Sequence, residues 1–335
     1  MSGMKDGQFF VGVDIGGTSI KTGVVSAEGE TLNKLTAPSI KAGTRNEGLA
    51  SLYKTMEDVV EQSEIGWNQI DGIGVAAPGT MDIETGVVFH PFNMPGWENL
   101  PLRDFVAERF GKPTILHNDA NAAAYGEYWQ GAAKDSKSLM FWTLGTGIGG
   151  GIVINGEIIT GAHSHAGECG HIIIQAEGGP YSEHGIHGSL ELYAGAKALI
   201  RRCKAALTAG ARSIIPVQLA QGKELTPFLI FECASDGDEL ANRLIMETGR
   251  YLGIGTVNII HTINPDTVLI GGAMTFGRRK TELGRQFLEH VREEVRKHTF
   301  PIPAERTRID YADLGKDAGF IGAAGCVLAH LQKGT

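Results

Sequence analysis

Two glycine-rich turns carry the chemistry that this sequence suggests. Ser138–Leu144 is an apolar run that reads as a buried strand, and the seven residues that follow it, Gly145–Gly151, contain five glycines. A backbone without side chains lets a phosphate come close to its amide groups. A second copy lies near the N-terminus, where a strand at 9–14 leads into the turn Ile15–Thr18. The pair predicts a duplicated fold that closes on one nucleotide.

The glycine run at Gly145–Gly151 also fits the glycine pattern of dinucleotide-binding proteins, so this alternative is considered first. Gly145, Gly147 and Gly150 satisfy G-x-G-x-x-G, a pattern that in dinucleotide-binding proteins opens a helix. Here the run is followed by Ile152–Ile159, in which β-branched residues and the pair Asn155-Gly156 predict a strand and then a hairpin. A unit of strand, turn and strand does not start a dinucleotide-binding fold.

Asp119 is the acidic side chain best placed to act on a substrate. A strand at 113–117 turns into a helix at Asn118 and Asp119, where either side chain can cap the free amides. A carboxylate at a strand-to-helix junction that faces a cleft with phosphate turns is also suited to accept a proton from a hydroxyl group. Both roles are compatible with the sequence.

The remaining elements follow from hydrophobic periodicity and capping. A short helix is expected to begin near Pro101 and to end at Gly111, and residues 208–227 form a polar surface segment. We predict strands at 30–36, 71–77 and 172–174 and in the stretch after Asp266, and helices at 45–64, 189–207, about 238–260, 284–298 and 317–332.

At its two turns the chain resembles the ROK family of sugar kinases, whose phosphate motifs read like Asp14–Thr18 and Gly145–Gly151. The similarity runs from about residue 9 to about residue 330. It implies an α/β fold of two actin-like lobes, duplicated from a ribonuclease-H-like unit, with a cleft between them. The expected lobes are residues 1–118, joined by the C-terminal helix at about 317–332, and residues 119–316.

The resemblance implies ATP and Mg²⁺ as cofactors. Asp14 would orient Mg²⁺ through water, because this ion keeps much of its hydration in proteins. Gly271 and Gly272 would border the adenosine. The residues expected to bind the nucleotide are Asp14, Gly16, Gly17, Thr18, Lys21, Thr146, Gly147, Gly149, Gly150, Gly271 and Gly272.

The resemblance also implies a sugar site, with Asp119 as the catalytic base. The segment Glu168–His171 matches the family's E-x-G-H motif, in which the glutamate and the histidine contact sugar hydroxyls. A further glutamate matches Glu191, and an asparagine matches Asn93. The residues expected to bind the sugar are Gly79, Asn93, Asn118, Asp119, Glu168, His171 and Glu191.

Most relatives hold a structural zinc with three cysteines, and this chain departs from that pattern. Ser182, His184 and Ser189 stand where the cysteines would be. Serine is a poor zinc ligand because its hydroxyl stays protonated, which leaves His171, His184 and His187 as a weak set. We therefore expect no structural zinc, although the sequence leaves open whether these histidines bind a metal.

Glucose is the first choice of substrate, because Glu168, His171 and Glu191 resemble the set in ROK glucokinases. N-acetylmannosamine, N-acetylglucosamine and fructose remain competitors, since a few hydrogen bonds separate epimers. Some ROK members are sugar-responsive repressors with an N-terminal DNA-binding domain. The first strand here begins at residue 9, so we expect no such domain. A silent sugar-binding module or an actin-like ATPase is a further alternative.

Composition limits the partners. The 335 residues are enough for two domains, and the formal charge of −8 gives no general attraction to nucleic acid or anionic lipid. No stretch is apolar for long enough to span a bilayer, and the start has no signal-peptide core, so a cytoplasmic protein is expected. The four cysteines are scattered and predict neither disulfides nor a zinc knuckle. The family resemblance implies a homodimer.

Overall fold

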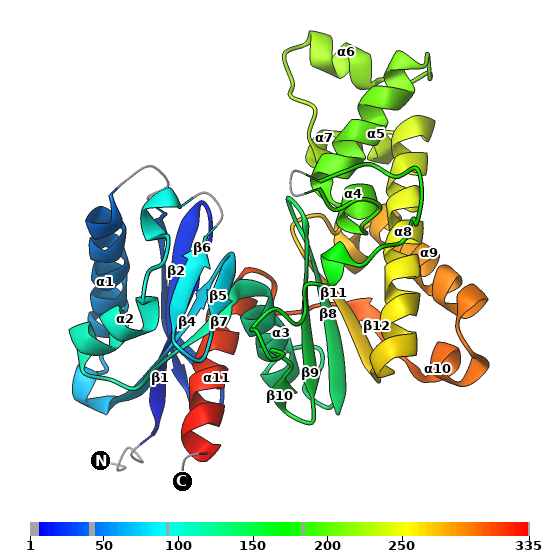
Figure 1. Ribbon diagram of the computed structural model, residues 1–335. Helices are drawn as coiled ribbons and strands as arrows, with labels where there is room; N and C mark the ends of the chain where they lie inside the picture. The colour runs from blue at the N-terminus through cyan, green and yellow to red at the C-terminus, as the bar shows by residue number, and fades with distance from the viewer. Residues whose placement is uncertain (1–6, 40–43, 92–93, 183–184, 334–335) are drawn as a thin grey trace. The chain divides into compact units, whose positions relative to one another are not determined.

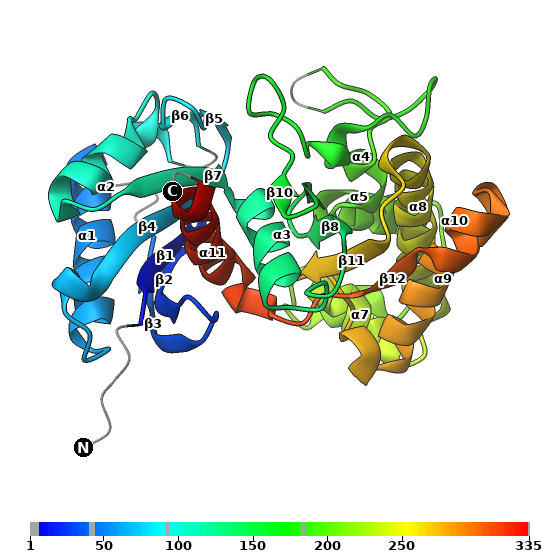
Figure 2. The same cartoon turned by 90° about the horizontal axis from the view of Figure 1, so that it is seen from below.

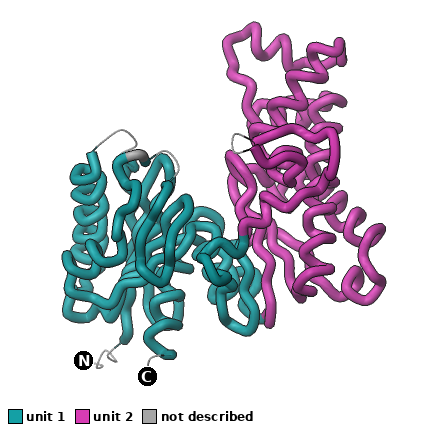
Figure 3. Tube along the Cα trace, viewed as in Figure 1, with its two compact units in different colours: residues 1–135, 151–167, 313–335 teal, residues 136–150, 168–312 magenta. Residues whose placement is uncertain are grey.

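The computed structural model describes residues 7–39, 44–91, 94–182 and 185–333. The chain folds as two compact units (Figure 3). Unit 1 consists of residues 1–135, 151–167 and 313–335, and unit 2 of residues 136–150 and 168–312.

The first five-stranded sheet has the order β3-β2-β1-β4-β7 (Figure 1). Strand β2 runs antiparallel to both β1 and β3, and β4 runs parallel to both β1 and β7. The strands are β1 (Phe9–Ile15), β2 (Ser19–Ser26), β3 (Thr31–Pro38), β4 (Ile70–Ala77) and β7 (Thr114–Asn118). The hairpin of β1 and β2 turns at Gly16–Thr18, as the sequence predicted.

Helix α1 (Arg45–Glu61) covers one face of this sheet. Alternate residues of β1, such as Val11 and Val13, point to this face and join a buried cluster with Leu52 and Met56 of the helix. Thr44 caps α1 through a capping box, which fixes where the helix begins.

Helices α11 (Ala318–Lys333) and α3 (Asp119–Trp129) pack against each other, and α11 also packs on β1 and β4 (Figures 1 and 2). Phe10 of β1 points to this side and clusters with Phe320 and Val327. A β-carbon on Gly12 would overlap the carbonyl oxygen of Phe320. Glycine is therefore required for the helix backbone to approach the sheet this closely.

The second sheet repeats the order of the first, β10-β9-β8-β11-β12. Strand β11 runs parallel to β8 and β12, and β10 runs antiparallel to β9. The strands are β8 (Ser138–Leu144), β9 (Ile148–Ile154), β10 (Glu157–Ile158), β11 (Thr267–Gly272) and β12 (Arg308–Tyr311). Two sheets of one design confirm the predicted duplicated α/β architecture.

Long helices complete unit 2. Helix α8 (Glu239–Ile263) is capped by the Asp238 side chain, and it packs against α9 (Glu282–His298), α5 (Ala196–Thr208) and α7 (Pro227–Ser235). The other elements are β5 (Thr80–Asp82), β6 (Val87–His90), α2 (Leu102–Phe110), α4 (Glu191–Ala194), α6 (Ile215–Ala220) and α10 (Pro301–Arg306), with single turns of 3₁₀ helix at Trp67–Gln69, Pro95–Trp97, Cys169–His171, Arg278–Lys280 and Gly315–Asp317.

Four expectations about the elements were wrong. Ile172–Ile174 form no strand but only an isolated bridge from Ile173 to Ser189. The predicted helix at 189–207 is broken at Gly195 into α4 and α5. The strand after the glycine run begins at Ile148 rather than Ile152. The segment at 208–227 does not lie wholly at the surface, because it contains α6, in which Ile215 is buried.

In the part of the chain that the structure describes, no helix has both the length and the apolar character needed to cross a bilayer.

Candidate active site

Asp14 and Asn118, two predicted site residues of unit 1, lie at one edge of the first sheet. Strands β1, β4 and β7 are parallel, and the register pairs Asp14 with Ala76 and Ala77 with Asn118. The carboxyl ends of all three strands therefore meet at this edge, which is where ligands bind in open α/β sheets.

Asp14 forms an ion pair on this edge. Its carboxylate lies 3.1 Å from the Lys21 ammonium, and both side chains are mostly buried. A β-carbon on Gly319 would lie 2.6 Å from the Asp14 Cγ, so the first turn of α11 comes very close to the acid. The turn after β1 is closed by the Gly16 amide, which donates to the Ser19 carbonyl across 2.9 Å.

Asp119 is the first residue of α3 and is half-buried. The Asn118 side chain caps the helix by accepting from the amides of Ala120 at 2.9 Å and Asn121 at 3.4 Å. The Asp119 Oδ1 also accepts from the Ala120 amide at 2.9 Å. The predicted cap is confirmed at Asn118, and the aspartate is held at the start of the helix.

Gly79 and Asn93 are two further residues that were predicted to bind the sugar. Gly79 has a φ of +92°, and a side chain there would overlap the His90 carbonyl oxygen. Glycine is thus required by the chain itself, whatever it binds. Asn93 lies outside the described residues.

The glycine run of unit 2 is a tight turn followed by a strand. The Gly145 amide donates to the Gly147 carbonyl across 2.9 Å, and Thr146 at the tip is exposed. Gly149 and Gly150 lie within β9, because the strand begins at Ile148. The turn itself is therefore shorter than the glycine run.

Gly271 and Gly272 lie beside this turn. Strand β11 runs parallel to β8, and its last residue, Gly272, is in register with Leu144, the residue before the turn. Gly272 has a φ of +89° and is exposed, whereas Gly271 is buried against the Phe141 ring. The structure thus brings both predicted nucleotide segments of unit 2 to one sheet edge.

The segment Glu168–His171 packs on the same turn. Its residues form one turn of 3₁₀ helix, and the Glu168 carboxylate lies 3.8 Å from the His171 ring nitrogen Nε2. A β-carbon on Gly170 would overlap the carbonyl oxygen of Ile148. The glycine of the E-x-G-H motif is therefore explained by its contact with the first residue of β9.

Glu191 contacts the backbone amide of Ile148, whereas Gly170 packs against the carbonyl oxygen of the same residue. The Ile148 amide donates to the Glu191 Oε2 across 2.9 Å. Sequence reasoning assigned Glu191 to the sugar and did not foresee this bond, because nothing in a separation of 43 residues signals a contact. Ile148 is thus flanked by both predicted sugar-binding segments of unit 2.

The histidines do not assemble a metal site in the described residues, where no group of three or more His, Cys, Asp or Glu side chains is close enough to hold an ion. Among those residues the His171 Nδ1 is buried and has no hydrogen-bond partner. His184 lies outside the described part of the chain. Desolvation raises the pKa of the buried Cys169 thiol to about 12, which does not favour a thiolate ligand.

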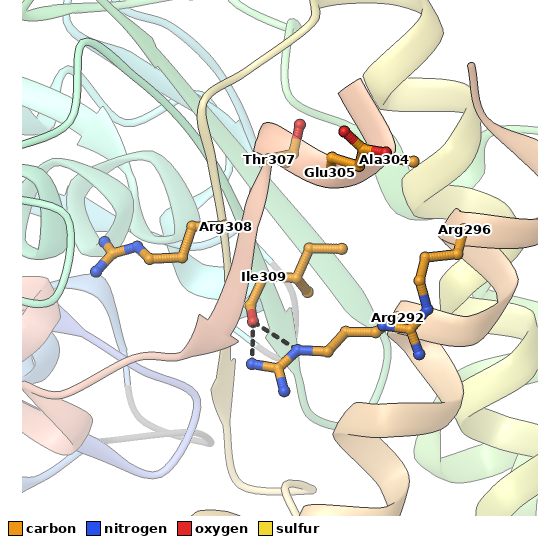
Figure 4. A pocket seen from close by; sticks show the side chains of 7 residues that line it. All are labelled: Arg292, Arg296, Ala304, Glu305, Thr307, Arg308 and Ile309. Atoms are coloured by element: carbon orange, nitrogen blue, oxygen red, sulfur yellow. Dashed lines mark hydrogen bonds between the residues drawn. The ribbon is translucent and has the colours of Figure 1, made fainter. Parts of the chain in front are cut away.

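A separate hollow of about 240 Å³ lies between α9, α10 and β12 (Figure 4). Arg292 donates to the Ile309 carbonyl through Nε at 3.1 Å and Nη2 at 2.8 Å, and Arg296 pairs with Glu289. None of the predicted site residues lines this hollow, and its two α9 arginines are already paired. It is not the candidate site.

Comparison with known proteins shows to which family this chain belongs. The model of the ROK family matches residues 10–330. The chain belongs to the ROK family. This protein is 33% identical over 335 residues to a glucokinase of Halalkalibacterium halodurans, with 98% of each chain covered.

Two other ROK proteins show the range of the family. A xylose repressor of Caldicellulosiruptor bescii is 30% identical over 328 residues, covering 98% of this chain and 80% of the repressor. A ROK glucokinase of Streptomyces griseus, solved in complex with glucose and AMPPNP, superposes with a TM-score of 0.77 at 30% identity, covering 95% of this chain and 98% of that one. Kinases and repressors are thus both similar to this ROK protein.

Proposed function

We propose that this ROK protein is an ATP-dependent hexose kinase that transfers the γ-phosphoryl group to a sugar hydroxyl, with glucose as the first candidate. The observation that best supports the proposal is the arrangement around Ile148. The turn expected to hold phosphates and the segments of Glu168 and Glu191 expected to hold sugar meet at this one residue. The glucokinase relatives point to the same activity.

Phosphoryl transfer requires little covalent catalysis by the protein, because it depends on positioning and on charge neutralisation. Backbone amides of the turns after β1 and β8, other than those of Gly16 and Gly145 that close the turns, hold the phosphate oxygens, and the Thr18 and Thr146 hydroxyls assist them. Mg²⁺ neutralises phosphate charge when bound. Asp14, whose carboxylate pairs with the Lys21 ammonium, would orient this ion through its bound waters, because Mg²⁺ keeps much of its hydration.

Asp119 acts as the general base. An aspartate is far less basic than an alkoxide, so the proton moves late, once bonding to phosphorus has acidified the sugar hydroxyl. Asn118 holds the helix start that carries the acid. Asn118, Glu168, His171 and Glu191 fix the sugar ring through hydrogen bonds.

The test is a panel of hexoses assayed with ATP and Mg²⁺ for sugar-dependent ADP release. Asp119→Asn is expected to lower kcat by about 10² or more with little change in sugar affinity, since a general base contributes on this scale. Asp71→Asn, an exposed aspartate of β4 in the same unit, is the matched control. A variant Asp119→Asn with wild-type turnover would remove this residue from the mechanism.

A second candidate is a sugar-responsive regulator without kinase activity, which the similarity to xylose repressors favours. Sugar binding by calorimetry without sugar-dependent ADP release would support it over the kinase. Within the kinase proposal, N-acetylmannosamine, N-acetylglucosamine and fructose stay in the panel. A cytoplasmic homodimer remains our expectation. The four cysteines are free, and disulfides are rare in cytosolic proteins.

A further inference from the structure

The chain crosses itself at Gly188, between the two segments of unit 2 that are expected to bind the sugar. The amides of Ile174 and Gln175 donate to the Gly188 carbonyl at 2.9 and 3.2 Å, and the Gly188 amide donates to the Pro180 carbonyl at 3.1 Å. Gly188 has a φ of +67°, and a β-carbon there would overlap the Gln175 carbonyl oxygen. We call this contact of Ile174, Gln175, Pro180 and Gly188 the Gly188 crossing.

The Gly188 crossing leads directly into both sugar-binding segments. Beside it, the Leu190 amide donates to the Ile172 carbonyl at 2.9 Å. His171 comes immediately before Ile172, and Glu191 comes immediately after Leu190. The backbone from which these two side chains project is therefore set by a pairing that continues from the crossing.

Tyr193 of α4 reaches the Gly188 crossing. A β-carbon on Gly179 would lie 2.7 Å from the Tyr193 hydroxyl oxygen and 3.0 Å from the Gly188 Cα, so the hydroxyl and the crossing both lie close to Gly179. Tyr193 follows Glu191 by two residues in the same short helix. One tyrosine thus links α4 to the chain on the far side of the crossing.

Tyr251 of α8 supports the Tyr193 ring. The two ring centroids lie 5.0 Å apart with the rings inclined at 49°, a separation at which aromatic pairs attract each other. The guanidinium groups of Arg202 and Arg250 lie 5.5 and 5.3 Å from the Tyr251 ring centroid, within the range of cation–π interactions. Arg202 also pairs with Glu247 at 2.9 Å. Tyr193 therefore rests on a well-connected part of the long helix.

The cysteines that hold zinc in most relatives are absent from this segment. Ser182, His184 and Ser189 stand at their positions, and a serine hydroxyl stays protonated. Tyr181 of the same segment is 70% exposed, so its ring buries little area that could hold the chain in place. The contact of Tyr193 with the Gly188 crossing is better suited to replace the metal, because it is supported from α8.

We propose that Tyr193 is a positioning residue of the sugar site: together with Tyr251 it braces the Gly188 crossing in the place of a metal. The brace fixes the backbone from which His171 and Glu191 reach the sugar. This inference rests on the proposed function, because it takes these two residues to be sugar ligands. Tyr193 acts through the backbone of the segment and not on the reacting atoms.

The test measures KM and kcat for glucose with ATP and Mg²⁺ at saturation. Tyr193→Ala removes the ring and is expected to raise the KM for glucose by about ten-fold or more, because misplacing a positioned group by about 1 Å can cost about 10²-fold. Partial unfolding would lower kcat through the loss of active enzyme but would leave KM unchanged. Tyr193→Phe keeps the ring on Tyr251 and is expected to stay within about two-fold of the wild-type KM.

Phe228→Ala is the matched control, because it removes an aromatic ring that is 65% exposed on α7 of the same unit. It is expected to leave the KM for glucose unchanged. Tyr251→Ala is expected to act like Tyr193→Ala, and the double variant should lose little more than either single variant, since the two rings act as one unit. Fully additive losses would contradict a shared brace.

Gly179→Ala supplies a second variant in case Tyr193→Ala does not fold. Its methyl group would press on the Tyr193 hydroxyl and on the Gly188 Cα, so the KM for glucose is expected to rise. A wild-type KM in Tyr193→Ala, or in Gly179→Ala where the first variant does not fold, overturns the inference and leaves the kinase proposal standing.

Glucose binding by calorimetry separates failure of the inference from failure of the proposed function. If the wild type binds glucose but phosphorylates no hexose, the kinase proposal is wrong, and the inference is then judged by the glucose affinity of the same variants. Weaker binding by Tyr193→Ala than by Tyr193→Phe would support the brace, and equal binding would overturn it. If the wild type binds no sugar of the panel, both proposals are wrong.

Discussion

The Glu127 carboxylate accepts the backbone amide of Leu314 across 2.8 Å, although 187 residues separate them in the chain. The same fully buried side chain also accepts from the amides of Ala132 at 3.0 Å and Asp313 at 3.1 Å. The Ala132 amide lies just before the chain first leaves unit 1, and the other two amides lie where it returns for the last time, at residue 313. One acid in α3 therefore holds two of the four places at which the chain passes between the units.

Glu127→Gln is expected to destabilise unit 1. A glutamine keeps one acceptor, but its amino group would face a backbone N–H, so at least one buried donor loses its partner at a cost of about 1–3 kcal/mol. Urea unfolding measures the loss. Glu108→Gln, an exposed position of α2, is the control and should change little. Equal midpoints for the two variants would contradict a role for Glu127 in stability.

Gly12→Ala should weaken the contact between β1 and α11. The added methyl group would overlap the Phe320 carbonyl oxygen, and backbone cannot move aside as a flexible side chain can. Overpacking of this kind costs about 1–3 kcal/mol, seen as a lower thermal midpoint. Gly145→Ala is a control for stability, because a β-carbon there meets nothing within 4 Å. A Gly12→Ala protein as stable as Gly145→Ala would mean that α11 shifts freely on the sheet.

Local signals explain what the sequence predicted. The Asn155-Gly156 turn has both residues at positive φ, and Gly111 ends α2 with a φ of +63°. These features depend on the residues of the turn itself. The duplicated strand–turn–strand pattern indicated a repeated fold, and the family resemblance supplied the fold itself, whereas the order of the strands was not predicted.

Long-range contacts explain what the sequence could not predict. The apolar run Ile172–Ile174 favours a strand, but among the described residues it forms only the bridge from Ile173 to Ser189, and Ile173 is 57% exposed. Gly195 breaks the helix between α4 and α5 at the point where it meets Gly147. The bond from Ile148 to Glu191 likewise depends on how two distant segments pack. Such positions are set by tertiary packing rather than by local preference.

His117 should make the protein less stable in mild acid. Desolvation, helped by the His330 charge, lowers the pKa of this β7 side chain to about 4 from its ordinary 6.5. Its folded-state pKa is depressed, so the unfolded chain binds the proton more tightly, and stability falls as pH drops from about 6.5 toward about 4. The full effect is about 3 kcal/mol at most.

His117→Asn is expected to flatten this pH dependence. The difference in unfolding free energy between pH 7 and pH 4.5 should shrink by about 2–3 kcal/mol in the variant, because the residue no longer titrates. His163→Asn, an exposed histidine of unit 1, should keep the wild-type slope. Parallel curves for wild type and His117→Asn would mean that His117 is protonated as readily in the folded state as in the unfolded chain.

Metal removal should leave the protein unchanged. Structural zinc needs about four ligands of the thiolate, imidazole or carboxylate type, and Ser182 and Ser189 offer only hydroxyls that stay protonated. The His171 Nδ1, buried without a partner among the described residues, is one ligand and not a set. We expect purified protein to contain well below one zinc ion per chain and EDTA to leave its thermal midpoint unmoved. Stoichiometric zinc together with a midpoint lowered by EDTA would show that the histidines of residues 171–187 replace the cysteines of the relatives.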